Sequence, residues 1–121
     1  MHNFKKLDIW INSLEFSKFI YLKTAQFPKE EQFGLTSQMR RSSVSIVSNI
    51  AEGSGRGSDK EFIRFLEISI ASSFESETQL ILFKELNYLS LEYFDKLENK
   101  LQSIQKMIFG FKKEFIKVNR S

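Results

Sequence analysis

The sequence predicts an all-α protein, a single domain over residues 1–121 folded as an antiparallel, up-down-up-down four-helix bundle. Apolar residues recur at steps of three and four, which is the spacing of one face of an α-helix. One proline and five glycines leave few breaks, whereas many short strands would need more turn residues. We therefore expect four helices joined by short turns, at about residues 7–26, 35–52, 58–87 and 91–118.

The first predicted helix ends before Pro28, because proline disfavours the helical conformation in the residue that precedes it. Its expected core face follows a helical spacing and consists of Leu7, Trp10, Leu14 and Tyr21. Further bulky side chains lie beside that face and exceed what one neighbouring helix can cover: Phe16, Phe19 and Ile20.

The second predicted helix begins at about Leu35 and ends in the glycine-rich segment 53–58, Gly-Ser-Gly-Arg-Gly-Ser. Its expected core face consists of Leu35, Met39, Ser43, Ile46 and Ile50. Many small residues along this helix predict a close approach to a neighbouring helix: Ser42, Ser43, Ser45, Ser48 and Ala51.

The third predicted helix starts with a capping box, in which Ser58 is the N-cap and Glu61 its partner. Its main stripe consists of Phe62, Leu66, Ser69, Ser73, Ser76, Leu80 and Phe83. A second apolar stripe lies about 100° away around the helix: Ile63, Ile70, Phe74 and Ile81. Surplus apolar surface of this extent on helices one and three predicts a homo-oligomer, because soluble monomers rarely expose it.

The fourth predicted helix has the clearest periodicity, with Ser90 as a plausible N-cap. Its apolar positions alternate steps of three and four over more than three heptads: Phe94, Leu97, Leu101, Ile104, Ile108, Phe111, Phe115 and Val118.

Composition argues against several functional classes. The chain has no cysteine and a single histidine, His2, which we place in a frayed tail. No Ser–His–Asp or Cys–His set can be built, and a di-metal bundle site needs Glu-x-x-His pairs, so we expect no enzyme, metal site or cofactor. There is no signal-peptide core and no apolar run near the roughly 20 residues that cross a bilayer. We therefore expect a cytoplasmic protein with no membrane partner.

The net charge of +3 is unevenly distributed. Four of the five arginines lie between residues 40 and 64, and from Lys100 onward six basic residues stand against one acid. Segment 53–58 could suggest a phosphate-binding loop, but such loops follow a strand and this one follows a helix. A turn between helices is the better reading, with weak anion binding left open. We expect Glu75 or Glu77 to pair with Arg40 or Arg41 across the bundle.

Several segments of helices two and three are more specific, among them Ser-Asn-Ile-Ala-Glu-Gly at residues 48–53 with Arg56 after it. Together they resemble the bacterial family of 23S ribosomal RNA intervening-sequence proteins, and the segments that carry this resemblance are 27–35, 37–46, 48–56, 59–66 and 72–80.

The resemblance implies a four-helix bundle that assembles into a homo-oligomeric ring, with a pentamer favoured, and no enzymatic activity. Related accessory proteins of diversity-generating retroelements bind a reverse transcriptase and RNA through basic surfaces. Matched to this chain, the candidate RNA contacts are Arg40, Arg41, Arg56, Lys60 and Arg64. We expect the contact to centre on the last three of these residues.

Two functions remain open at this point. Clustered arginine favours RNA binding, because a guanidinium suits bidentate contacts with phosphate. The modest +3 favours the alternative, a structural homo-oligomer that recruits a protein partner, such as a reverse transcriptase, without direct nucleic-acid binding.

Overall fold

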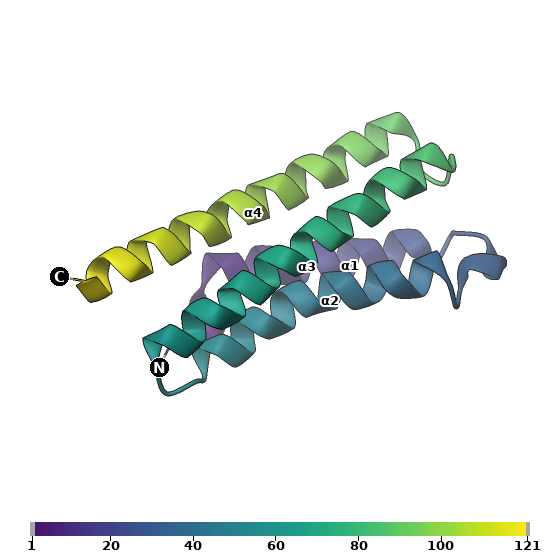
Figure 1. Ribbon diagram of the computed structural model, residues 1–121. Coiled ribbons are helices and arrows are strands. Elements are labelled where there is room, and N and C mark those ends of the chain that lie inside the picture. The colour runs from purple at the N-terminus through teal and green to yellow at the C-terminus, as the bar shows by residue number, and fades with distance from the viewer. Residues whose placement is uncertain (1, 121) are drawn as a thin grey trace.

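The computed structural model describes residues 2–120 of the chain, and for residues 117–120 it describes the backbone alone. The described residues form helices and no strands, so the protein is all-α with four long helices (Figure 1). The helices begin and end within two residues of the predicted ranges. The elements are η1 (Phe4–Lys6), α1 (Asp8–Thr24), η2 (Lys29–Glu31), α2 (Leu35–Ser54), α3 (Asp59–Glu85) and α4 (Leu91–Arg120).

Each long helix packs against two others. In the described chain α2 packs against α1 and α3, and α4 packs against α3 and α1, while no Cα atom of α1 lies within 8 Å of a Cα atom of α3. Thus α1 and α3 lie diagonally across the bundle. We call the end where α1 begins and α4 ends the terminal end, which lies at the left in Figure 1, and the opposite end the distal end.

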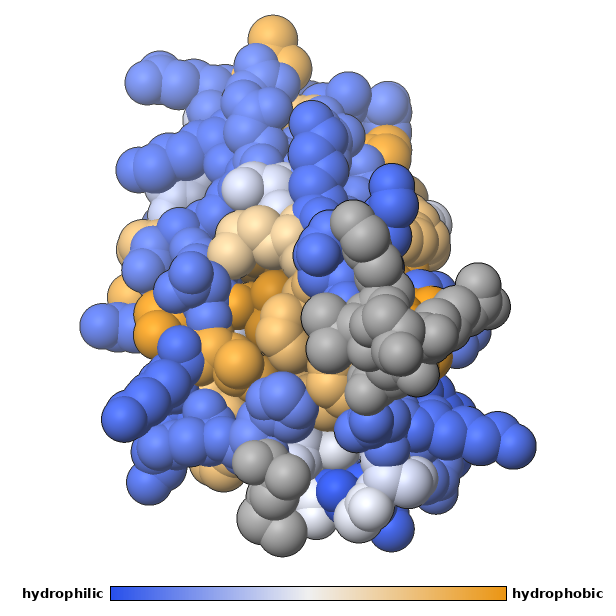
Figure 2. Space-filling view, turned by 90° about the vertical axis from the view of Figure 1, so that its left-hand side faces the viewer, coloured by the Kyte–Doolittle hydropathy of each residue, from blue (hydrophilic) through white to orange (hydrophobic). Residues whose placement is uncertain are grey.

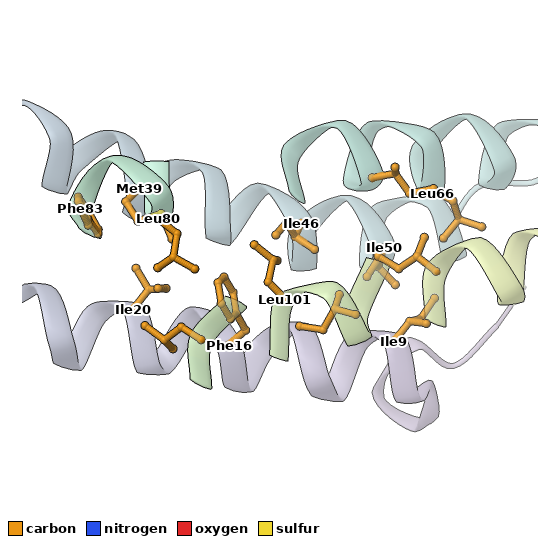
Figure 3. Close-up of a cluster of buried hydrophobic side chains, with 14 of the residues drawn as sticks. Ile9, Phe16, Ile20, Met39, Ile46, Ile50, Leu66, Leu80, Phe83 and Leu101 are labelled. Atoms are coloured by element: carbon orange, nitrogen blue, oxygen red, sulfur yellow. The ribbon is translucent and has the colours of Figure 1, made fainter. Parts of the chain in front are cut away.

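The core is a continuous column of apolar side chains contributed by all four helices (Figure 3). The periodic face predicted for α4 is confirmed from Phe94 to Phe115, whereas the side chain of Val118 lies outside the described residues. The largest fully buried apolar side chains are Phe16, Ile20, Met39, Ile46, Ile50, Leu66, Leu80, Phe83, Leu101, Ile104 and Ile108.

The prediction for the core face of α1 was wrong at its centre. Leu14 and Tyr21 are exposed, while Phe16 and Ile20, assigned to surplus surface, lie in the core. The buried face also contains two serines, Ser13 and Ser17. The prediction used only large apolar residues and therefore placed the buried face of α1 on the wrong side of the helix. The true buried face includes these two serines, which pack where α1 meets its neighbours.

The contact between α2 and α3 is lined by serines, and we call it the serine seam: Ser42, Ser45, Ser69, Ser72 and Ser76. Two hydroxyl pairs bridge the helices, Ser42 with Ser76 at 2.7 Å and Ser45 with Ser72 at 2.8 Å. Farther along, the Ser69 hydroxyl donates to the Ile46 carbonyl at 2.9 Å. The residue numbers rise along α2 as they fall along α3. Small side chains bring the two helices close enough for these bonds.

The predicted helix starts of α3 and α4 are confirmed by their capping bonds. Ser58 Oγ accepts from the Glu61 amide at 3.2 Å, and Ser90 Oγ accepts from the Tyr93 amide at 3.1 Å. Each bond satisfies one amide that the first turn of a helix leaves without a partner. The short turns that these caps create keep α2, α3 and α4 adjacent.

Candidate nucleic-acid interface

Charge is segregated along the length of the bundle. The terminal half, residues 1–14, 44–71 and 103–121, carries ten basic and six acidic residues, a net charge of +4. The distal half, residues 15–43 and 72–102, carries eight basic and nine acidic residues, a net charge of −1. The whole excess of positive charge therefore lies in the terminal half, where a polyanion would experience the strongest attraction.

The structure brings Arg56 and Arg64 together over one aromatic ring. Their guanidinium carbons lie 4.9 Å and 4.6 Å from the ring centroid of Phe65. Each also forms an ion pair within its own turn or helix, Arg56 with Glu52 at 2.8 Å and Arg64 with Glu61 at 2.7 Å. All four charged side chains are about half exposed, so these pairs are open to solvent and to competing anions.

The hydrogen bond from Arg64 to Glu61 lowers the pKa of the Glu61 carboxyl, and the same bond raises the pKa of the Arg64 guanidinium. Both groups are therefore held in their charged forms. Lys60, on the same helix, is exposed and forms no ion pair with a described residue.

Arg40 and Arg41 lie in the distal half and do not join the group on Phe65. Arg40 donates to Thr24 Oγ1 at 2.9 Å, and its guanidinium lies 4.7 Å from the Tyr21 ring centroid. Arg40 therefore stabilises the packing of α2 against the end of α1. Arg41 pairs with Glu75, as predicted for one of the two acids.

Glu77, the other half-buried acid of this stretch, has a different role. It accepts hydrogen bonds from the side-chain amides of Gln102 and Gln105 on α4, at 3.1 Å and 3.0 Å. The carboxylate thereby ties α3 to α4.

The second half of α4 adds basic residues that were not among the sequence-derived candidates. Lys106 and Lys113 are exposed, lie seven residues apart, and form no ion pair with a described residue. Seven residues are close to two helical turns, so both lie on the face of α4 opposite its core positions. The excess of basic residues after Lys100 was the available signal, but it did not single out individual positions.

A hollow of ≈ 540 Å³ opens between the start of α3 and the end of α4. Figure 2 views this end and shows apolar surface exposed among hydrophilic residues. Three acids and two bases accompany two isoleucines in the lining, which consists of Asp59, Lys60, Glu61, Ile63, Arg64, Glu67 and Ile116. An apolar side chain with a mixed-charge surrounding would fit this hollow better than a phosphate would.

His2 does not lie in a frayed tail. Its backbone amide donates to the Ser54 carbonyl at 3.3 Å, and its ring packs on Phe62 and Phe115 with centroid separations of 5.1 Å and 5.4 Å. Because aromatic rings occupy this end of the bundle, the imidazole packs against them in a tilted arrangement that helix periodicity alone did not indicate.

Among residues 2–120 no three His, Cys, Asp or Glu side chains are grouped so as to hold a metal ion. None of the helices described there combines the length and apolarity needed to cross a membrane.

Comparisons with known proteins agree with this architecture. The family model described as 23S rRNA-intervening sequence protein matches residues 5–110. A crystal structure of a protein of unknown function from the S23 ribosomal protein family of Bacteroides thetaiotaomicron VPI-5482 superposes with a TM-score of 0.80 at 28% identity. The match covers 87% of this chain and 95% of that one. No curated protein matches the chain. With the family model spanning most of its length, the chain belongs to the 23S rRNA-intervening sequence protein family.

Proposed function

We propose that this protein is a non-enzymatic homo-oligomer that binds RNA through the terminal end of its bundle. Each copy would be one domain, an up-down-up-down antiparallel bundle, which the opposite residue order along the serine seam supports. The observation that carries the RNA-binding proposal is the segregation of charge, +4 in the terminal half against −1 in the distal half. The family description mentions 23S rRNA but names no ligand.

Two kinds of basic residue would contact phosphate. Lys60, Lys106 and Lys113 are exposed and form no ion pair with a described residue, so their charges are available at once. Arg56 and Arg64 would exchange their exposed carboxylate partners for phosphate oxygens. Exposed ion pairs stabilise a protein by only about 0.2–1 kcal/mol, so this exchange has a small cost.

Oligomerisation would increase the affinity for RNA, because the modest charge of one copy is repeated in every copy. In a ring whose bundles run parallel to the ring axis, the terminal ends of all copies lie on the same side, so the basic surface repeats once per copy. Several weak contacts on one RNA strand then act together through their high effective concentration. The family resemblance favours five copies.

The test measures binding of a fluorescent single-stranded RNA over a range of salt concentrations. Two charge-reversed proteins are compared with the parent: one carries Arg56→Glu, Lys60→Glu and Arg64→Glu, and the other Lys106→Glu and Lys113→Glu. Each lost phosphate contact should lower the slope of log affinity against log salt by about 0.7. A matched control, Lys29→Glu with Lys96→Glu, reverses two exposed lysines of the distal half and should bind as the parent does.

The second candidate function is recruitment of a protein partner without RNA. The hollow between α3 and α4 favours it, because its lining combines apolar side chains with charged side chains of both signs. If the parent shows no salt-dependent binding to RNA, recruitment becomes the better proposal. The substitution Ile63→Glu would then be expected to abolish capture of the partner while leaving the fold intact.

A further inference from the structure

Two exposed phenylalanines line one groove between the middle of α3 and the second half of α4. Phe74 on α3 is 48% exposed and Phe109 on α4 is 45% exposed, and neither belongs to the core. The groove has a volume of ≈ 250 Å³, and its lining consists of Glu67, Ile70, Ala71, Phe74, Phe109 and Lys112. Large apolar side chains that are exposed together mark a binding site, whereas single ones need no explanation.

Three lysines surround Phe109 on the outer face of α4. Lys106, Lys112 and Lys113 lie three residues before it, three after it and four after it, which are the neighbouring positions on a helix surface. The Nζ atom of Lys112 lies 6.0 Å from the centroid of the Phe109 ring. None of the three lysines forms an ion pair with a described residue. Phe109 is therefore an exposed aromatic ring with uncompensated positive charge on both sides.

The net charge of the chain comes from the same part of α4 and the residue that follows it. Residues 111–121 contain four basic residues and one acid, a net charge of +3, whereas residues 1–110 contain fourteen of each and are neutral. The positive charge of the whole chain is thus contributed by the segment that begins two residues after Phe109. A polyanion would be attracted to the surface of α4 around this groove.

The groove itself is unsuited to a phosphate. Its one lysine, Lys112, is balanced by the exposed carboxylate of Glu67, and the other lining residues carry no charge. Glu67 would repel a phosphate, but a carboxylate accepts hydrogen bonds from the exocyclic amino group of a base. An uncharged planar group therefore fits between the two phenylalanines, while phosphates fit beside the exposed Lys106 and Lys113.

The groove adjoins the larger hollow at the start of α3, because Glu67 lines both of them. Lys60 and Arg64, which are candidate RNA contacts, line that hollow. A strand that follows the furrow between α3 and α4 would therefore pass from the groove to these two basic side chains. This continuity favours RNA over a peptide or a membrane as the occupant of the groove.

We propose that Phe74 and Phe109 form a stacking site for an unpaired nucleobase, and that the lysines around Phe109 hold phosphates of the same strand. Aromatic side chains combined with basic residues bind single strands with little dependence on sequence. A duplex cannot use such a site, because its bases are already stacked and paired. The inference rests on the RNA-binding part of the proposed function, and it adds the form of RNA that is bound, a single strand with an accessible base.

The test measures the affinities of Phe74→Ala, Phe109→Ala and the parent for a fluorescent single-stranded RNA and for a duplex of the same length. Both positions are exposed, so helicity and oligomer size should stay those of the parent. Each substitution should weaken binding of the single strand by about 5- to 150-fold, because one stacked base is lost. The slope of log affinity against log salt should not change, because every phosphate contact remains. Affinity for the duplex should also be unchanged.

Two further substitutions separate stacking from apolar contact. Phe109→Leu keeps an apolar side chain without an aromatic face and should bind the single strand as weakly as Phe109→Ala. Phe109→Trp keeps the aromatic face and should bind at least as tightly as the parent. The matched control is Phe33→Ala, which removes a 90% exposed phenylalanine outside the groove and should bind both RNAs as the parent does.

Several outcomes would overturn the stacking site. Full affinity in Phe109→Leu would mean that the groove holds an apolar group and not a base. A smaller oligomer in Phe109→Ala would mean that the groove is a contact between copies. If the charge-reversed proteins lose affinity and Phe109→Ala does not, the stacking site fails while the proposed function stands. A parent that binds no RNA overturns both.

Discussion

Two contacts within the bundle are built from different kinds of residue. The serine seam joins α2 to α3 through small side chains and hydroxyl hydrogen bonds, whereas α4 meets its neighbours through large apolar residues such as Leu101 and Ile108. Apolar packing is non-directional and roughly proportional to buried area. Hydrogen bonds at close approach are directional, so they fix which residues lie opposite each other. Apolar burial is thus the main source of stability at the α4 contact, while the hydroxyl pairs of the seam fix the register of α2 against α3.

The largest effect is expected at the α4 contact. Leu101 is fully buried, and Leu101→Ala should lower the free energy of unfolding by about 2–5 kcal/mol through lost burial and a residual cavity. Urea denaturation measures the change. The matched control is Leu91→Ala on the same helix, which is mostly exposed and should change stability by no more than about 0.5 kcal/mol. Equal effects at the two positions would contradict the assignment of stability to the buried face of α4.

An intermediate effect is expected where the seam reaches the end of α2. A Cβ added at Gly53 would lie 2.6 Å from the Phe65 Cβ, so Gly53→Ala should destabilise the fold by about 1–3 kcal/mol. Gly110 on α4 is the control, because a Cβ there meets nothing within 4 Å. Gly110→Ala should instead stabilise the protein by about 0.5–1 kcal/mol. Thermal melts of both variants give the sign of each change in stability. A stabilising effect of Gly53→Ala would show that the close approach between Gly53 and Phe65 is absent.

The smallest effect is expected from the hydroxyls themselves. Ser42→Ala removes the bonds to Ser76 and Gln79 and should cost about 1 kcal/mol, although the change in volume is slight. Ser48→Ala, at an exposed position of the same helix, is the control and should be nearly neutral. If the hydroxyl pairs set the register, α2 should shift along α3 in Ser42→Ala. Hydrogen exchange of the backbone amides near Ser72 should then change in Ser42→Ala and not in Ser48→Ala. Identical behaviour of the two variants would mean that the hydroxyl pairs do not set the register.

The same contrast explains which parts of the fold the sequence could predict. Large apolar residues at heptad spacing identified α4, and capping residues identified the starts of α3 and α4. Periodicity failed on α1, where Ser13 and Ser17 occupy buried positions and displaced the predicted face. The burial of a small polar residue depends on which helix lies opposite it. Hydropathy does not indicate this, so the sequence pattern could not predict that these serines are buried.

Prediction of the site was limited in another way. The sequence indicated that Arg56 and Arg64 lie near each other, because Arg56 is in the turn before α3 and Arg64 is in the second turn of that helix. It did not indicate their ion pairs with Glu52 and Glu61, which depend on side-chain directions. Nor could it show that Arg40 binds the end of α1, because Thr24 is sixteen residues away in the chain.

Trp10 is the only tryptophan of the chain, and its half-buried ring lies 5.1 Å from that of Phe4 in an edge-on arrangement. Its fluorescence therefore reports on the junction of η1 and α1 at the terminal end, while the serine seam contributes no emission of its own. The chain also has no cysteine, so a single cysteine introduced at any exposed position accepts one dye without competing sites. Energy transfer from Trp10 to such a dye would give distances along the bundle.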